Sequence, residues 1–175
     1  MSNLEYYQVY NKNMERCDLK IARPNHVPEG YYFGVVDVIT YNKKNNSFLM
    51  TKRSMEKPSF PGYLEVTVGC MQYGEEPLDS AKRELREETG IINSKLYLVK
   101  TSFSTHAIAY TYISICDIEP DSIMLQKGET EAYYWYLEEE FRKIMKSDSI
   151  PPVQKGRIEP DLERIISRIK DVKDE

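Results

Sequence analysis

Three glutamates are crowded into the last turns of a predicted helix, in the stretch RELREE at residues 83–88. Glu84 and Glu88 are four residues apart, so their like charges repel one another by about 0.2–0.5 kcal/mol. Glu87 and Glu88 also face the negative end of the helix dipole, at a cost of about 0.3–1 kcal/mol each. An ordinary solvent-exposed face of a helix could tolerate these small energetic costs. The same cluster would suit a divalent cation, because hard cations bind several carboxylate oxygens at once.

The helix that presents these carboxylates is predicted to begin at Pro77 and to end before Gly90. Proline is favoured at the first helical position, and glycine readily adopts the left-handed geometry that ends a helix. Leu78, Ala81 and Leu85 recur at helical spacing, so we expect them to face the core. At about 100° per residue, the three glutamates occupy an arc of about 100° beside this apolar stripe. They are therefore expected close together, at the edge of the buried surface.

The three glutamates belong to a longer pattern of spaced residues that begins upstream of the helix. Gly69 is followed after five residues by Glu75 and after seven more by Arg83, and Gly90 and Ile91 close the pattern. The stretch resembles the Nudix box, G-x5-E-x7-R-E-U-x-E-E-x-G-U with U an aliphatic residue, and every fixed position is filled. A match with so many constrained positions is far more specific than a lone short motif. The resemblance extends less specifically over residues 31–145.

Membership of that family would imply an α/β fold, namely an α/β/α sandwich with a mixed β-sheet. It would also imply hydrolysis of a small-molecule diphosphate, typically a nucleoside diphosphate linked to another moiety, by water attack at phosphorus. The resemblance implies that Glu84, Glu87 and Glu88 bind Mg2+ or Mn2+, with the carbonyl group of Gly69 as a further ligand. A bound cation would neutralise developing charge and lower the pKa of a bound water, whose proton a carboxylate then accepts. Glu84 and Glu87 are therefore candidate catalytic residues.

The resemblance also assigns roles around the carboxylates. Arg83 becomes a candidate catalytic residue that would orient a carboxylate, and Glu75 would help to hold the loop. The proton acceptor stays open, because members of the family use either a glutamate of this motif or one from a later loop. Here Glu129 and Glu131 lie just ahead of the strand that contains Trp135. For both of these glutamates a structural role at the surface is favoured over catalysis.

Basic residues lie just upstream of the motif, in TKRSMEKPSFPGY. Lys52, Arg53 and Lys57 flank a proline- and glycine-containing loop. This resembles the arm of the Nudix-fold isopentenyl-diphosphate isomerases and of allied hydrolases, in which basic residues meet the substrate's diphosphate. Arg53 and Lys57 are therefore candidate substrate-binding residues, although three solvated surface charges would fit the pattern equally well.

Two alternative functions belong to other classes. A diphosphate-dependent isomerase is disfavoured, because the isomerases have a catalytic cysteine where this chain has Val68. Cys70 is expected to be a packed thiol rather than a nucleophile. A domain that binds its ligand without turnover is disfavoured by the complete carboxylate set, since binding alone needs no base.

Around this motif the chain reads as intermixed strands and helices, which favours a layered α/β domain. We expect one domain over residues 1–175, with an N-terminal hairpin and connector at 1–28 and a C-terminal helix at 157–175. Paired strands are predicted within residues 6–22. Further strands are predicted at 31–41, 47–53, 64–68, 95–105, 107–115 and 131–137, and helices at 138–146 and 159–172.

The composition of the chain bears on its binding partners and on its location in the cell. The 175 residues carry a formal net charge of −4, which gives no support for a nucleic-acid-binding function. No stretch approaches the length of an apolar membrane span. The opening residues show no export pattern, so a cytoplasmic location is expected. The three cysteines are widely spaced, which indicates reduced thiols and neither a disulfide framework nor a zinc site. The N-terminal hairpin could pair between subunits and form a homodimer.

Overall fold

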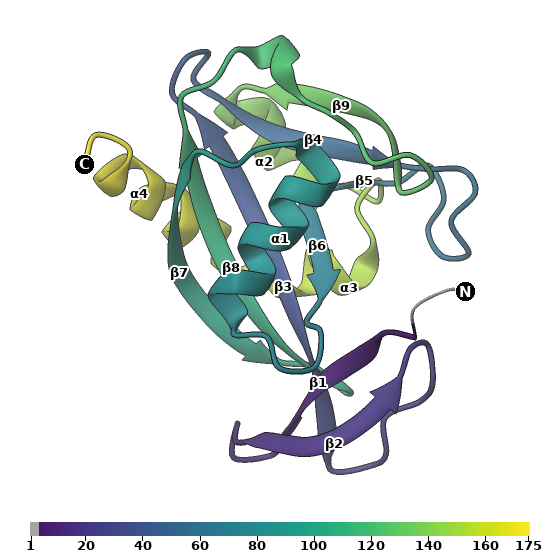
Figure 1. The fold of residues 1–175 in the computed structure, drawn as a ribbon. Helices are drawn as coiled ribbons and strands as arrows, with labels where there is room; N and C mark the ends of the chain where they lie inside the picture. Colours follow the sequence, from purple (N-terminus) through teal and green to yellow (C-terminus); the bar gives the residue numbers. More distant parts are fainter. Residues whose placement is uncertain (1–3) are drawn as a thin grey trace.

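The computed structural model describes residues 4–175, whose strands form one nine-stranded mixed sheet (Figure 1). Its central strand β3 pairs in antiparallel fashion with β1, β4 and β6, and in parallel with β8. The edges are extended by β2 on β1, by β7 on β8, and by β5 and β9 on β4. The strands are β1 Tyr6–Asn11, β2 Arg16–Ala22, β3 Tyr31–Asn42, β4 Ser47–Arg53, β5 Leu64–Glu65, β6 Thr67–Cys70, β7 Ser94–Phe103, β8 Ala107–Cys116 and β9 Thr130–Tyr136.

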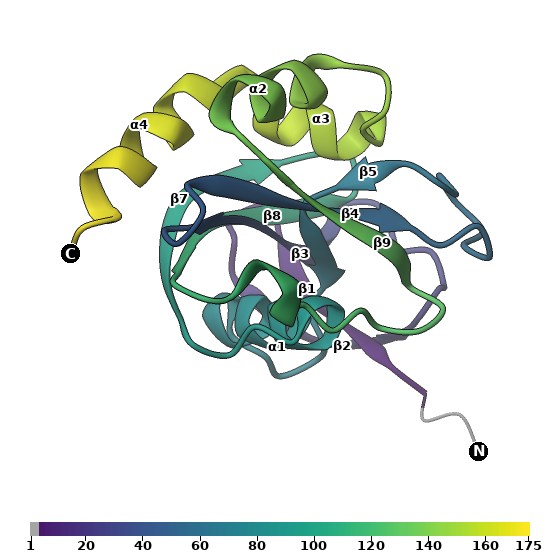
Figure 2. The same cartoon turned by 90° about the horizontal axis from the view of Figure 1, so that it is seen from above.

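Helices cover both faces of this sheet, as the view from above shows (Figure 2). The helix α1 (Pro77–Thr89) lies on one face, and α2 (Glu138–Lys146), α3 (Pro152–Ile158) and α4 (Leu162–Val172) lie on the other. Strand β3 contributes side chains to the core on both faces of the sheet, because successive side chains along a strand point to opposite faces. Its Val36 and Val38 pack with Leu85 of α1, whereas its Ile39 packs with Phe141 of α2. The predicted α/β/α sandwich with a mixed sheet is confirmed.

Strand β6 carries the glycine that begins the motif, and its boundaries differ from the prediction of one strand over residues 64–68. The strand is interrupted at Val66, so β5 ends at Glu65 and β6 begins at Thr67. The backbone N–H of Val66 donates to the Gln154 side chain at 3.1 Å, and its carbonyl oxygen accepts from the same side chain at 3.2 Å. A side chain thus replaces the neighbouring strand as the partner of this residue.

The helix α1 begins at Pro77 and ends at Thr89, before Gly90, which adopts the left-handed φ of 76° that the prediction requires. Ala81 and Leu85 are buried as expected. Leu78 is 39% exposed, so its predicted place in the core is wrong. The buried stripe is centred on Ala81, Leu85 and Glu88, and Leu78 stands at its margin in the first turn.

The two ends of the chain show one confirmed element and one corrected boundary. The N-terminal hairpin is formed by β1 and β2 as predicted, and β1 also pairs with β3 of the same chain. The C-terminal helix begins at Leu162, later than residue 157, because α3 and a short 3-10 turn at Glu159–Asp161 precede it. Among residues 4–175, no helix is long and apolar enough to cross a membrane.

Candidate active site

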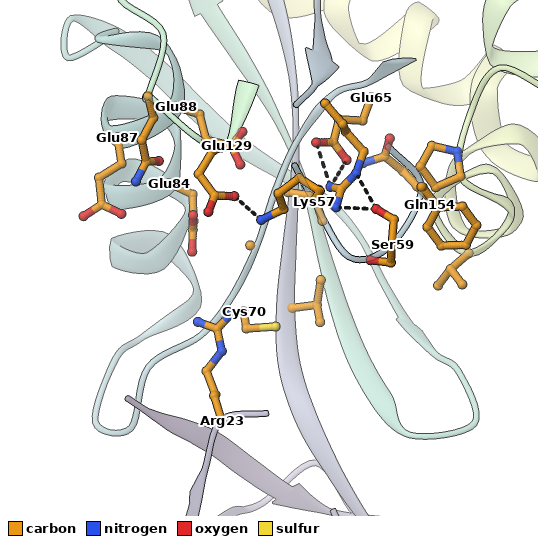
Figure 3. A pocket seen from close by; sticks show the side chains of 18 of the residues that line it. Arg23, Lys57, Ser59, Glu65, Cys70, Glu84, Glu87, Glu88, Glu129 and Gln154 are labelled. Carbon is orange, nitrogen blue, oxygen red and sulfur yellow. Dashed lines mark hydrogen bonds and ion pairs between the residues drawn. The ribbon is translucent and has the colours of Figure 1, made fainter. Parts of the chain in front are cut away.

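A cavity of about 450 Å³ opens beside the C-terminal half of α1 (Figure 3). Its walls come from α1, β6, the loop after β4, the N-terminal hairpin and α3. Carboxylates outnumber cations among the described residues that line it. The carboxylates are those of Glu5, Glu65, Glu84, Glu87, Glu88 and Glu129, and the cations are those of Arg23, Arg53, Lys57, Arg83 and Arg157.

Glu84 and Gly69 lie in direct contact where α1 crosses β6. A Cβ atom built on Gly69 would stand 1.9 Å from Cδ of Glu84 and 2.0 Å from its Oε1. No side chain can occupy that space without displacing the Glu84 carboxylate. The glycine at this position is therefore required by the close approach of helix and strand.

Arg83 ties the helix to the loop that leads into it. Its Nε and Nη2 atoms donate to the two oxygens of Glu75, at 2.6 and 2.9 Å. Its Nη1 donates to Glu84 at 2.8 Å and to Glu87 at 3.1 Å, and Nη2 also donates to the Cys70 carbonyl oxygen at 3.2 Å. One guanidinium thus holds Glu75 of the loop and two glutamates of the cluster, Glu84 and Glu87.

Glu88 is the most deeply buried carboxylate of the cluster. It is 6% exposed, and its Oε2 atom has no hydrogen-bond partner among residues 4–175. Burial raises the pKa of Glu88 well above its ordinary value, and the nearby charges of Glu65 and Glu84 raise it further. A buried carboxylate oxygen without a partner is costly, and either protonation or a bound cation relieves that cost.

The donor set fits a hard divalent cation. Carboxylates and a backbone carbonyl group are the oxygen ligands that Mg2+ prefers. The unpartnered oxygen of Glu88 and the Glu84 carboxylate that packs against Gly69 lie on the same cavity. Within residues 4–175 no three His, Cys, Asp or Glu side chains converge on one point, and Glu84 and Glu87 each direct an oxygen to Arg83.

Glu84 is a partly buried carboxylate whose pKa lies near neutrality. Burial raises its pKa to about 7, against the lowering effect of Arg83, while the charge of Glu87 raises it and that of Arg23 lowers it. A carboxylate of this kind exchanges protons readily near neutral pH. Its surroundings therefore suit a group that takes part in acid–base chemistry or in cation binding.

The two predicted substrate-binding residues, Arg53 and Lys57, both line the cavity. Figure 3 shows Lys57 beside Glu129. Arg53 donates to both oxygens of Glu65 at 2.8–2.9 Å and to the Ser59 carbonyl oxygen. All three of its guanidinium nitrogens therefore already donate to protein groups. Lys57 forms an ion pair with Glu129. Of the two, Lys57 is the freer to meet a ligand.

The two later glutamates have different positions. Glu129 lines the cavity, where Lys57 binds it. Glu131 is not among the residues that line the cavity; it pairs with Lys52 at 2.7 Å and accepts a hydrogen bond from the Met55 backbone. These contacts give Glu131 a structural part at the surface.

Several residues of the cavity were missed by the sequence reasoning. Arg23 and Glu5 come from the N-terminal hairpin, and Gln154 and Arg157 come from α3. Arg157 forms a bidentate ion pair with the fully buried Asp37, with both hydrogen bonds at 2.7 Å. These residues belong to no local motif, and only the folded chain brings them to residues 69–91.

Comparison with known proteins gives a family match over most of the chain. Residues 32–155 match the model of the NUDIX domain. A curated relative, Nudix hydrolase 3 of Arabidopsis thaliana, is 24% identical over 162 residues, which cover 82% of this chain and 21% of the relative. The ADP-ribose pyrophosphatase of Bacillus subtilis (strain 168) is 26% identical over 113 residues, covering 65% of this chain and 57% of that protein. The chain thus spans about a fifth of one relative and under three fifths of the other.

The fold also matches solved structures. The crystal structure of the protein DR0079 from Deinococcus radiodurans superimposes with a TM-score of 0.70. The match covers 94% of this chain and 98% of that one, at 18% sequence identity. At this identity the likeness shows a shared fold, which extends beyond residues 32–155.

Proposed function

The chain belongs to the NUDIX domain family, and from that premise we propose that it is a metal-dependent pyrophosphohydrolase. It would cleave the diphosphate bond of a nucleoside diphosphate-linked or related small metabolite by water attack at phosphorus. The observation that carries this proposal is the contact of Glu84 with Gly69 beside the buried, unpartnered oxygen of Glu88. Together they form a set of oxygen donors on a cavity large enough for a small molecule.

Mg2+ is the proposed cation, with Mn2+ as a substitute of the same ligand preference. Glu84, Glu87, Glu88 and the carbonyl oxygen of Gly69 would hold it. When bound, such a cation neutralises charge on the phosphate oxygens and makes a bound water more acidic. The excess of carboxylates over cations in the cavity supports this role, because an anionic substrate would otherwise be repelled.

The chain's own residues position the reactants. Arg83 fixes the loop through Glu75 and orients the carboxylates of Glu84 and Glu87. We assign the acceptor of the water's proton to these two box glutamates, because burial raises the pKa of Glu84 to about 7, a value that suits proton transfer near neutral pH. Glu129 is instead the ion-pair partner of Lys57. When substrate binds, Lys57 would leave its ion pair with Glu129 and contact the substrate's phosphate.

ADP-ribose is the first substrate to test, since the Bacillus subtilis relative is named for its hydrolysis. The experiment incubates the protein with Mg2+ and ADP-ribose, nucleotide sugars, dinucleoside polyphosphates, nucleoside triphosphates or prenyl diphosphates, and measures release of phosphate-terminated products. We expect hydrolysis of at least one diphosphate, abolished by chelation of the cation. Tight binding of a panel member without any turnover would instead indicate a ligand-binding domain. Isomerised isopentenyl diphosphate would indicate an isomerase.

A further inference from the structure

We propose that Arg23, which directly follows β2 of the N-terminal hairpin, is a substrate-binding residue that contacts the diphosphate group of the ligand. The inference rests on the proposed function, because it requires an anionic substrate in the cavity. Arg23 lies outside residues 32–155, the segment that matches the NUDIX domain. The hairpin would therefore add a phosphate contact of its own to the domain.

The hairpin is fastened to the loop that follows Gly69. The Gln8 N–H donates to the Met71 carbonyl oxygen at 2.9 Å, and the Tyr73 N–H donates to the Tyr6 carbonyl oxygen at 2.9 Å. The side-chain oxygen of Gln8 also accepts a hydrogen bond from the Gly74 N–H at 2.9 Å. Because this loop leads from β6 into α1, the hairpin is held in a fixed relation to the proposed cation ligands.

The side chain of Arg23 extends from the hairpin into the cavity, toward Cys70 (Figure 3). Its Nη1 atom donates to Glu5 at 2.8 Å, and its guanidinium carbon lies 5.6 Å from the centre of the Tyr7 ring. A guanidinium has five N–H donors, so the bond to Glu5 leaves donors for a second anion. Arginine is also the side chain whose planar donors best match phosphate oxygens.

Most other cations of the cavity are committed to buried or multiple partners. Arg53 is bound by both oxygens of Glu65, whose side chain is 4% exposed. Arg157 is bound by both oxygens of Asp37, whose side chain is fully buried. Arg83 holds three glutamates. Withdrawing any of these cations would strand a buried charge, which is unfavourable.

Arg23 and Lys57 are different, because their partners are accessible to solvent. The side chain of Glu5 is 49% exposed and that of Glu129 is 42% exposed. Ion pairs of this kind contribute little stability and exchange readily. An incoming diphosphate can therefore recruit both cations, Lys57 from the loop after β4 and Arg23 from the hairpin, while their carboxylates return to water.

The test compares variants for binding of methylenediphosphonate, a diphosphate analogue that cannot be hydrolysed, by calorimetry in excess Mg2+. Arg23→Ala should weaken binding about tenfold, which corresponds to about 1.4 kcal/mol. Arg23→Lys should give an intermediate loss, since it keeps the charge and loses the paired donors. Lys20→Ala is the matched control: it removes one positive charge from the same hairpin, where Lys20 lies over the Tyr73 ring, and should leave binding unchanged.

A second variant keeps the inference testable if Arg23→Ala disturbs folding. Glu5→Gln removes the competing carboxylate from an exposed position, so it should strengthen binding of methylenediphosphonate several-fold. The same change in an Arg23→Lys background should give a smaller gain. Equal affinity of the wild type, Arg23→Ala and Glu5→Gln would overturn the assignment of Arg23.

The experiments distinguish a failure of the Arg23 phosphate contact from a failure of the proposed hydrolase function. Weaker binding by Arg23→Ala in a protein that hydrolyses none of the panel would support the phosphate contact and contradict the hydrolase. Hydrolysis by the wild type with unchanged KM in Arg23→Ala would support the hydrolase and contradict the contact.

Discussion

The carboxylate of Glu84 occupies the space that a side chain at Gly69 would need, with Cδ 1.9 Å from the position of a Cβ atom there. Gly69→Ala must therefore displace either the strand or the carboxylate. We expect it to reduce hydrolysis by about 10²-fold or more, because small misplacements of a catalytic group have effects of this size. Steady-state kinetics with the best substrate of the panel measures the loss.

Gly156→Ala is the control for this substitution. Gly156 lies within α3, and a Cβ atom there would meet nothing within 4 Å. The change should leave activity intact and raise the free energy of unfolding by about 0.4–1 kcal/mol, since alanine restricts the unfolded chain. Equal activity of the two alanine variants would show that the contact between Gly69 and Glu84 has no functional importance.

Glu87→Gln and Glu88→Gln should each lower the turnover rate by about 10³-fold or more, because stabilisation by the cation is worth several kcal/mol. Both variants should keep the fold, as circular dichroism would verify. Glu131→Gln serves as the control outside the cavity and should retain activity. Glu129→Gln should retain far more activity than Glu87→Gln, and the reverse order would move the proton acceptor to Glu129.

Cation binding should be visible without any substrate. A cation at 100 times its dissociation constant stabilises the folded protein by about 2.7 kcal/mol. We expect Mg2+ to raise the Tm of the wild type and to have little effect on that of Glu88→Gln. Without cation, Glu88→Gln should be at least as stable as the wild type, because it removes a buried carboxylate whose Oε2 has no partner among the described residues. An identical shift in both proteins would exclude Glu88 as a ligand.

Cys70 lines the cavity, yet burial raises the pKa of its thiol, which disfavours the nucleophilic thiolate. The contact it makes with Arg83 uses its backbone carbonyl oxygen. Cys70→Ala should therefore retain hydrolysis, measured on the same substrate as the other variants. Complete loss of activity in a folded Cys70→Ala protein would reopen a covalent mechanism.

The ion pair of Arg157 with Asp37 fastens α3 to the sheet beneath the cavity. Asp37→Ala should lower the free energy of unfolding by about 3–5 kcal/mol, because it leaves a buried charge without its partner. Replacing both residues by apolar side chains of similar size should recover much of the loss. Urea denaturation measures both effects, and a double variant less stable than Asp37→Ala would contradict this explanation.

The sequence was informative wherever the relevant contacts are local. Gly69, Arg83 and Glu84 lie on consecutive elements, so the spacing of one motif could predict that they meet. The intermixed strands and helices likewise predicted a layered α/β domain, and the family resemblance implied helices on both faces of its sheet. The interruption at Val66 could not be predicted, because its hydrogen-bond partner Gln154 is 88 residues away.

The missed part of the cavity has a similar cause. The helix α3 begins with prolines and contains Gly156, a composition typical of a loop, and it forms because Gln154 and Arg157 are held by buried partners. Arg23 belongs to a hairpin whose docking depends on hydrogen bonds to the loop after β6. Such residues become candidates only when the fold has joined distant segments.

The most direct test of the proposed chemistry is hydrolysis in water enriched in oxygen-18, using the panel substrate that the wild type cleaves fastest in Mg2+. Mass spectrometry of the products should show one labelled oxygen on the phosphate of a single product, and Glu87→Gln should form almost none of it. Products without label on phosphate, or equal labelling by Glu87→Gln, would contradict water attack at phosphorus directed by the carboxylates of α1.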